Sequence, residues 1–125
     1  MKNFHILHTE AAFGWGGQEI RIFQECQLLL ERGHKVSIIC QLNSPLYKKC
    51  LTITSPSFTC YSLRMKSSVN IFSYRSLSKL IKNIKPDIIH THSSIDSWIA
   101  GIIGNLLGFP VVRSRHISIP ITSIA

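Results

Sequence analysis

Acidic residues are scarce in this sequence, and it contains no long apolar run. Only six of the 125 residues are Asp or Glu, against fourteen Lys or Arg, so the formal net charge is +8. The longest apolar stretch, Trp98 to Val112, is broken by three glycines, an asparagine and a proline, and it is shorter than the ~20 residues that span a bilayer. The first residues, "MKNFHILH", have too few apolar side chains for a secretory signal. We therefore expect a cytoplasmic protein without a transmembrane segment.

Several common motifs are also missing. The chain has no C-x-x-C pair, no H-E-x-x-H motif and no G-K-[ST] run. The usual zinc-binding signatures and the P-loop motif are therefore absent from the sequence. Because cytosolic proteins rarely form disulfides, Cys26, Cys40, Cys50 and Cys60 are expected to be free thiols in the core or at the surface.

The apolar content is sufficient for one folded domain. Aliphatic and aromatic residues make up 45% of the sequence, which excludes disorder. Its middle segment, Lys35 to Pro86, holds nine Lys or Arg and no carboxylate. Such a segment is usually a solvated face, and the alternative is contact with anionic lipid or phosphate. Nucleic acid is not expected as a partner, because the basic residues are not interleaved with aromatic residues that could stack on bases.

Short apolar runs alternate with amphipathic stretches along the chain. We predict strands over Phe4–His8, Lys35–Cys40, Phe58–Leu63, Asp87–His92 and Pro110–His116. Helices are predicted over Gln18–Arg32, from Tyr74 to Ile84 and over Ile95–Leu107, with Gln41–Ser57 as an irregular connection. Ser93 and Asp96 form an S-x-x-D capping box at the start of the last helix, and Gly108 ends it. This alternation predicts a doubly wound α/β domain with a mostly parallel, Rossmann-like sheet. In the usual strand order 3-2-1-4-5, His8, His92 and His116 meet at the carboxyl edge of the sheet, where such folds bind ligands.

Three glycines follow the first predicted strand, in the stretch "HTEAAFGWGGQEIRIFQE". They do not complete the dinucleotide fingerprint G-x-G-x-x-G, because Glu19 stands at the third glycine and no carboxylate ends the second strand. Such glycines let backbone N–H groups approach an anion or a sugar hydroxyl at a helix N-terminus. A tight turn without a ligand explains them as well. Trp15 favours the sugar site, since an aromatic ring can stack on a sugar.

Two histidines lie close together on the fourth predicted strand. His90 and His92 are two residues apart and share one face of the strand, a spacing that suits a pair of metal ligands. His8, Glu10 and His116 are the candidates for a third ligand, and the sequence does not choose among them. We favour hydrogen bonding to a ligand, or a structural role, and predict no metal site.

The last predicted strand ends in "RSRH", Arg113 to His116. These residues alternate between the two faces of the strand. Arginines at a strand end usually face water. In a central strand they would require a carboxylate or phosphate partner, because burying an unpaired guanidinium is costly.

Three segments together, "HTEAAFGWGGQEIRI", "PDIIHTHSSIDSW" and "VVRSRHIS", resemble the N-terminal domain of the GT-B glycosyltransferases, specifically the retaining family 4. The resemblance covers almost the whole chain. In that family two Rossmann-like domains face each other across a cleft, with the acceptor mainly on the N-terminal domain and the nucleotide-sugar donor on the C-terminal one. It implies transfer of a hexose from a nucleotide-diphosphate sugar to a polysaccharide or glycolipid acceptor, with no further cofactor.

The resemblance also implies individual site residues. Gly16 and Gly17 match the loop that approaches the donor phosphates. His116 matches a histidine that reaches the transferred sugar, and it is the predicted catalytic residue. The predicted substrate-binding set is Trp15, Gly16, Gly17, His92, Ser93 and Arg115.

The chain departs from the family in its length. Family members continue into a second domain, whereas this chain stops nine residues after His116 and has no two Glu separated by seven residues, the donor-side motif. We therefore expect residues 1–125 to be an incomplete acceptor-side domain that is inactive without a donor domain. Its open sheet edge would invite a separate donor domain or self-association. The alternative is a non-catalytic basic module that binds an anionic membrane surface or a partner chain.

Overall fold

The computed structural model describes residues 3–65 and 71–113. Within these ranges, strands and helices alternate as the sequence pattern predicts. The elements are β1 (His5–Glu10), α1 (Gly17–Glu31), β2 (Lys35–Cys40), α2 (Pro45–Cys50), β3 (Phe58–Ser62), α3 (Ile71–Ile84), β4 (Ile88–Thr91), α4 (Ser94–Leu107) and β5 (Val111–Arg113).

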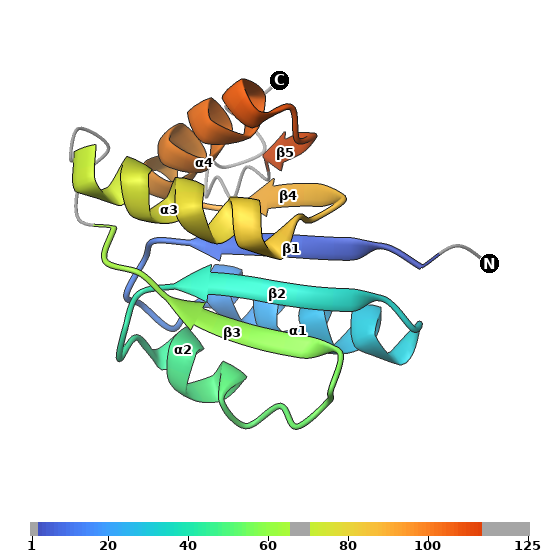
Figure 1. Cartoon of the computed structure of the whole chain (residues 1–125). Helices are drawn as coiled ribbons and strands as arrows, with labels where there is room; N and C mark the ends of the chain where they lie inside the picture. The colour runs from blue at the N-terminus through green and yellow to red at the C-terminus, as the bar shows by residue number, and fades with distance from the viewer. Residues whose placement is uncertain (1–2, 66–70, 114–125) are drawn as a thin grey trace, which may run out of the picture.

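The strands form one parallel sheet in the order β3-β2-β1-β4-β5. This confirms the predicted fold class and strand order. Helices α3 and α4 cover one face of the sheet and α1 lies on the other (Figure 1). In the centre, His8 of β1 pairs with Ile38 of β2 on one side and with His90 of β4 on the other. The winding reverses between β1 and β4, so their carboxyl ends border the crevice where such folds bind ligands.

Alternate side chains of the strands fill two separate cores. One core joins the sheet to α3 and α4, and its buried members include Leu7, Ile39, Leu77, Ile81, Ile89 and Ile99. The other joins the sheet to α1 and α2 through Ile22, Cys26, Val36, Ile38, Leu46 and Cys50. Each fully buried aliphatic side chain contributes ~1.5–3 kcal/mol, so these cores hold the helices against both faces of the sheet.

The irregular connection predicted over Gln41–Ser57 is wrong in its first half, which contains α2. Ser44 caps this helix by accepting a hydrogen bond from the Tyr47 N–H at 3.1 Å, and Pro45 occupies its first turn. Leu46 and Cys50, one turn apart, are buried. Six residues are too few to establish a helical period, so only the Ser-Pro start signal could have revealed it.

Other element boundaries differ by a few residues. β1 continues two residues past the predicted end to Glu10, because its backbone pairing with β2 persists to Cys40 although Thr9 and Glu10 are polar. Of the last predicted strand, Ser114 to His116 lie outside the described residues. The four cysteines are free thiols, as predicted. None of the helices in the described ranges is long and apolar enough to cross a membrane.

Helix α4 ends at Leu107, as the sequence predicts, and begins one residue before the predicted Ile95. Its first turn carries the Ser93–Asp96 capping box, and Gly108 closes it in the left-handed region at φ 82°. Near its end, α4 approaches the sheet closely at Gly104. A Cβ there would lie 2.4 Å from Val111 Cγ2 and 3.3 Å from Ile89 Cδ1, whereas a Cβ at Gly101 would meet nothing within 4 Å.

These two glycines give a matched pair of substitutions on one helix. We expect Gly104→Ala to lower the free energy of unfolding by about 1–3 kcal/mol, because the methyl group overpacks the contact with β5. Gly101→Ala should raise it by up to ~1 kcal/mol, because alanine is the better helix former. Urea denaturation of both variants measures the difference, and equal effects would contradict the close approach at Gly104.

Candidate functional site

Three histidines meet near the carboxyl edge of β1 and β4. The Nδ1 atom of His8 lies 2.9 Å from the Nε2 atom of His92. The rings of His8 and His92 are stacked with centroids 5.2 Å apart, and the His90 ring lies 5.1 Å from His8 and 4.2 Å from His92. The predicted meeting of His8 and His92 at one edge is therefore confirmed. The third member of that prediction, His116, lies outside the described residues.

The predicted substrate-binding residues differ in exposure. Trp15, Gly16 and Gly17 are exposed and Ser93 is half-buried, whereas His92 is only 4% exposed. Arg115, like the predicted catalytic His116, lies outside the described residues. The role of His92 toward a substrate stays a prediction, and its burial favours contacts within the protein.

The carboxylate of Asp96 holds the ends of β1 and β4 together. It is fully buried at the start of α4. Its Oδ2 atom accepts hydrogen bonds from the Thr9 hydroxyl at 2.6 Å and the His92 N–H at 3.0 Å. Its Oδ1 atom accepts from the N–H groups of Ser93 at 2.9 Å and Ala11 at 3.3 Å, and from the Ser93 hydroxyl. Sequence analysis identified Asp96 only as a helix cap. Its contacts with β1 depend on two strands that are distant in sequence.

A second buried carboxyl group, Glu10, stands at the end of β1. It accepts hydrogen bonds from the side chain of Gln18 and, at 3.3 Å, from the Ala12 N–H. Burial raises the pKa of Glu10, and the nearby charge of Asp96 raises it further. Burial also raises the pKa of Asp96, while hydrogen bonds from Ser93 and Thr9 act in the opposite direction. The edge therefore holds two carboxyl groups out of water by bonding them to the chain.

The loop after β1 is fixed from the side of β2 by the buried amide of Gln41. This side chain donates to the carbonyl oxygens of Ala11 at 3.0 Å and Met65 at 2.8 Å, and accepts from the Met65 N–H at 3.0 Å. Nothing in the local sequence marked Gln41 as important, because all its partners are at least 24 residues away. The loop is thereby positioned from beneath while its glycines face outward.

The fold itself makes no steric demand for the loop glycines. Among the described residues, a Cβ at Gly17 would meet nothing within 4 Å, and at Gly14 or Gly16 it would meet only a Glu19 carboxylate oxygen at 3.6–3.7 Å. No backbone angle at these three positions falls in the left-handed region. Neither the space around these positions nor their backbone angles therefore give a reason for glycine in a tight turn without a ligand. Glu19, which replaces the third glycine of the fingerprint, accepts a hydrogen bond from the Gly16 N–H at 2.9 Å.

Trp15 lies beside this loop against an edge of Phe23, with ring centroids 6.4 Å apart, and stays 37% exposed. Together with Pro45, Lys48, Lys49 and Thr52 it lines a shallow surface hollow. An exposed indole next to two ammonium groups provides a stacking surface and positive charge, which suits a sugar that carries phosphate.

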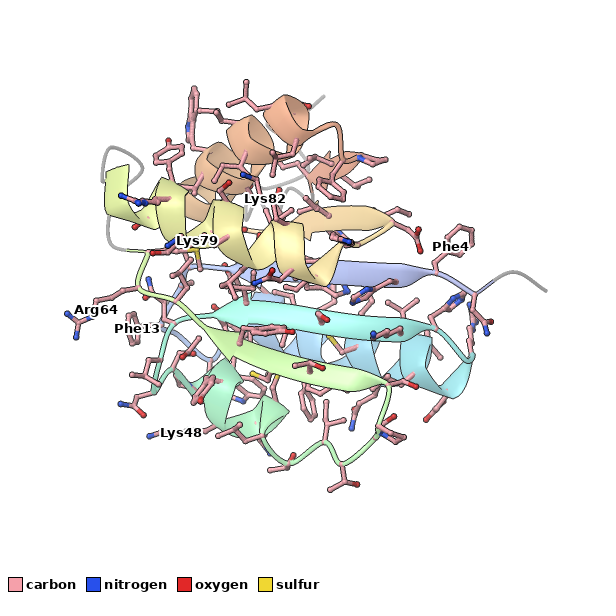
Figure 2. The ribbon with its side chains drawn as sticks, in the orientation of Figure 1. Phe4, Phe13, Lys48, Arg64, Lys79 and Lys82 are labelled. Atoms are coloured by element: carbon pink, nitrogen blue, oxygen red, sulfur yellow. The ribbon has the colours of Figure 1, made fainter. Side chains whose placement is uncertain are left out.

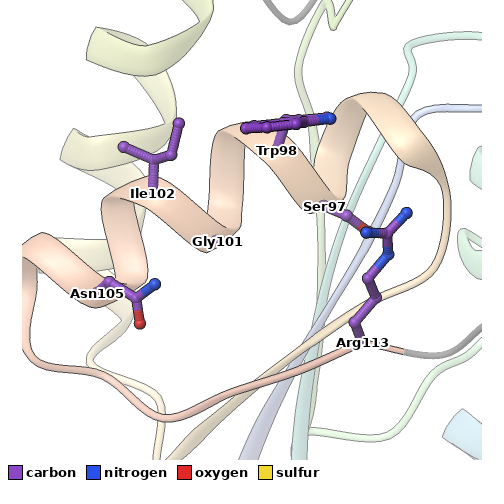
Figure 3. Close-up of a pocket in the computed structure, with 6 residues that line it drawn as sticks. All are labelled: Ser97, Trp98, Gly101, Ile102, Asn105 and Arg113. Carbon is purple, nitrogen blue, oxygen red and sulfur yellow. The ribbon is translucent and has the colours of Figure 1, made fainter.

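Arg113, at the end of β5, is exposed, and β5 is the edge strand of the described sheet. Of the two interpretations given above, the water-facing arginine is confirmed for this residue. Its guanidinium turns toward Ser97 and Trp98 of α4 across a second hollow (Figure 3). Trp98 is 60% exposed, so an arginine and a tryptophan border this part of the edge.

The parallel sheet and the winding reversal between β1 and β4 define the class as a Rossmann-like α/β domain, with the glycine loop at its carboxyl edge. Two solved structures share this fold. MurG from Acinetobacter baumannii matches with a TM-score of 0.75 at 16% identity, over 94% of this chain and 36% of that one. A glycosyltransferase from Rickettsia africae matches with a TM-score of 0.73 at 22% identity, over 98% of this chain and 32% of that one.

The sequence comparisons place the chain more narrowly. Residues 15–124 match Glycosyltransferase Family 4, and the chain belongs to that family. It is 31% identical over 122 residues to the UDP-Gal:alpha-D-GlcNAc-diphosphoundecaprenol alpha-1,3-galactosyltransferase of Escherichia coli. That alignment covers 93% of this chain and 32% of the relative, so the chain spans about a third of the length of the enzyme it matches.

The hydrogen bonds of Asp96 lead to a stability prediction. We expect Asp96→Ala to lower the free energy of unfolding by about 3 kcal/mol or more, because the Thr9 hydroxyl and the N–H groups of His92 and Ser93 lose a buried acceptor. Glu31→Ala, at the exposed end of α1, is the control and should change stability by no more than ~0.5 kcal/mol. Urea denaturation compares the two, and similar small losses would show that Asp96 does not join the strands.

Proposed function

We propose that this chain is the acceptor-side domain of a retaining glycosyltransferase. The complete enzyme transfers a hexose from a nucleotide-diphosphate sugar to a polysaccharide or glycolipid acceptor, on the cytoplasmic side of the membrane. Membership of Glycosyltransferase Family 4 and the activity of the Escherichia coli relative, which uses UDP-Gal and an alpha-D-GlcNAc-diphosphoundecaprenol acceptor, support this proposal. The chain alone is inactive, since the donor-side carboxylate motif is not in it.

The single observation that carries the proposal is the exposed glycine loop without an internal reason for its glycines. Gly16 and Gly17 lie at the start of α1, where the helix N-terminus favours an anion. Without a Cβ at these positions, a diphosphate can reach the backbone N–H groups. The Gly16 N–H already donates a hydrogen bond to Glu19. We therefore assign the direct phosphate contact to the N–H group of Gly17.

In the proposed reaction this domain positions the substrates and stabilises negative charge on the leaving diphosphate. The bond to the leaving diphosphate breaks as the acceptor hydroxyl attacks, and negative charge grows on the diphosphate. The Gly17 N–H and the N-terminus of α1 stabilise that charge, while Trp15 and the adjacent lysines hold the sugar or phosphate of the acceptor. His116 remains the predicted catalytic residue on the strength of the family resemblance.

A chimera tests the transfer function. We fuse residues 1–125 to the part of the Escherichia coli galactosyltransferase that follows its matched third, and supply UDP-Gal with the acceptor of that enzyme, alpha-D-GlcNAc-diphosphoundecaprenol. The chimera should transfer galactose and the chain alone should not. Gly17→Ala should lower kcat/KM by roughly 10- to 100-fold, the loss expected for one hydrogen bond to a charged group.

Gly14→Ala is the matched control in the same loop, and its kcat/KM should stay within about twofold, a difference well below one lost hydrogen bond. Circular dichroism checks that each chimera is folded. Equal losses in the two variants, or a folded chimera without transfer, would contradict the proposed role of the loop.

A peripheral membrane contact is the second candidate, because basic and apolar side chains gather beside the same loop. Phe13 and Arg64 border one hollow, and Lys48 lies at the same end of the molecule, where β1 to β3 finish (Figure 2). Phe13 is 59% exposed and Leu51, next to α2, is 58% exposed. Exposed apolar residues flanked by lysines suit the interface of an anionic membrane, and a lipid-linked acceptor would be supplied from that surface.

Vesicle sedimentation tests this contact. Replacing Lys48 and Lys49 by alanine should weaken binding to phosphatidylglycerol vesicles by roughly tenfold or more, since each lysine near an anionic surface contributes ~1 kcal/mol. The control replaces Lys79 and Lys82, exposed on α3 and labelled in Figure 2, and should leave binding nearly unchanged. Equal weakening by both pairs would indicate attraction by net charge alone and exclude an oriented contact.

A further inference from the structure

The three histidines at the β1–β4 junction form a compact cluster of potential metal ligands. His8 and His90 are paired in register on neighbouring strands, and His92 follows two residues later, so all three side chains belong to one face of the sheet. One ring nitrogen from each residue lies within 4.8 Å of the other two. The sequence analysis predicted no metal site, and it left the third possible ligand open among His8, Glu10 and His116. The strand register brings His8 to the pair.

The burial of His8 favours a ligand at this position. Its side chain is fully buried, and among the described residues its Nε2 atom has no hydrogen-bond partner. A buried polar atom is normally satisfied by a hydrogen bond or by a bound ligand, and an imidazole nitrogen is a common metal ligand.

The carboxylate of Glu25, on α1, lies next to the histidine cluster. The Oε1 atom of Glu25 lies 3.6 Å from the Nδ1 atom of His90, whose side chain is 16% exposed. Carboxylates behind metal-binding histidines orient the ring and strengthen it as a ligand. The charge of Glu25 would also offset part of the charge of a divalent cation.

We propose that His8, His90 and His92 bind one divalent transition-metal ion of the zinc class, which links β1 to β4 below the loop edge. Imidazole ligands suit zinc, cobalt and nickel, whereas magnesium and calcium prefer oxygen. Tetrahedral Zn–N bonds of about 2.0–2.1 Å place ligand nitrogens roughly 3.3 Å apart. The ligand nitrogens of the cluster lie within 4.8 Å of one another, so the rings close by up to about 1.5 Å around the ion. Water completes the fourth position.

Metal titration of the whole chain tests this site. After EDTA treatment and dialysis, we expect calorimetry to show one Zn²⁺ per chain, and thermal denaturation to shift upward as Zn²⁺ is added. Co²⁺ should produce the visible absorption of a tetrahedral nitrogen site, and Mg²⁺ should not bind. The four free thiols could also attract zinc, and an intense near-ultraviolet thiolate band with Co²⁺ would assign the ion to them and overturn the proposal.

Variants separate the cluster from other histidines. His90→Ala, at the least buried position of the cluster, should weaken Zn²⁺ binding roughly 100-fold or more, and Glu25→Gln roughly tenfold. His34→Ala is the control, because His34 accepts a hydrogen bond from the Phe4 N–H at the other end of the sheet, and it should bind as the unaltered chain does. Circular dichroism confirms that each variant is folded. Unchanged affinity in folded His90→Ala, or no stabilisation of the unaltered chain by Zn²⁺, would refute the site.

Discussion

The buried carboxylate of Asp96 is the interaction on which the ligand edge depends. β1 and β4 are far apart in the sequence, and their ends must be held together before any crevice can form between them. Asp96 does this by accepting hydrogen bonds from Thr9 and Ala11 on one side and from His92 and Ser93 on the other. A carboxylate removed from water is stable only when such donors surround it. The start of α4 and the two strand ends are therefore fixed as one unit.

Two different environments result on the two sides of that unit. The glycine loop above it is exposed, positioned from below by Gln41, and free of internal steric demands at Gly17. The histidine cluster beneath the edge is enclosed, and His8 is withdrawn from water completely. An exposed backbone suits a substrate that comes and goes, whereas an enclosed set of imidazoles suits a resident ion. The proposed transfer function and the proposed metal site thus occupy neighbouring but separate places.

The comparisons show how fold and function separate in this architecture. The fold persists in MurG at 16% identity, because many combinations of aliphatic residues satisfy two cores around a parallel sheet. A fold shared at such low identity does not by itself specify a substrate, and the chain spans about a third of its Escherichia coli relative.

Most of the fold was determined by the sequence itself. Alternating apolar runs and amphipathic stretches predicted the sheet order, and Ser93, Asp96 and Gly108 marked the limits of α4, because capping and period are local properties of the chain. The short α2 was missed, since six residues do not establish a period. The sequence also pointed to Gly16, Gly17 and Trp15, which lie together in one loop.

Only the tertiary structure decided the contacts between distant strands. The pairing of His8 with His90, the reach of Asp96 to Thr9 and the clamp of Gln41 on Met65 all join residues at least 24 positions apart. The tertiary structure also decided which residues are buried. The sequence predicted His92 as a substrate-binding residue, whereas its side chain is only 4% exposed in the fold. The physical reason is that register and burial arise when whole strands pack, and no local pattern of residues encodes either one.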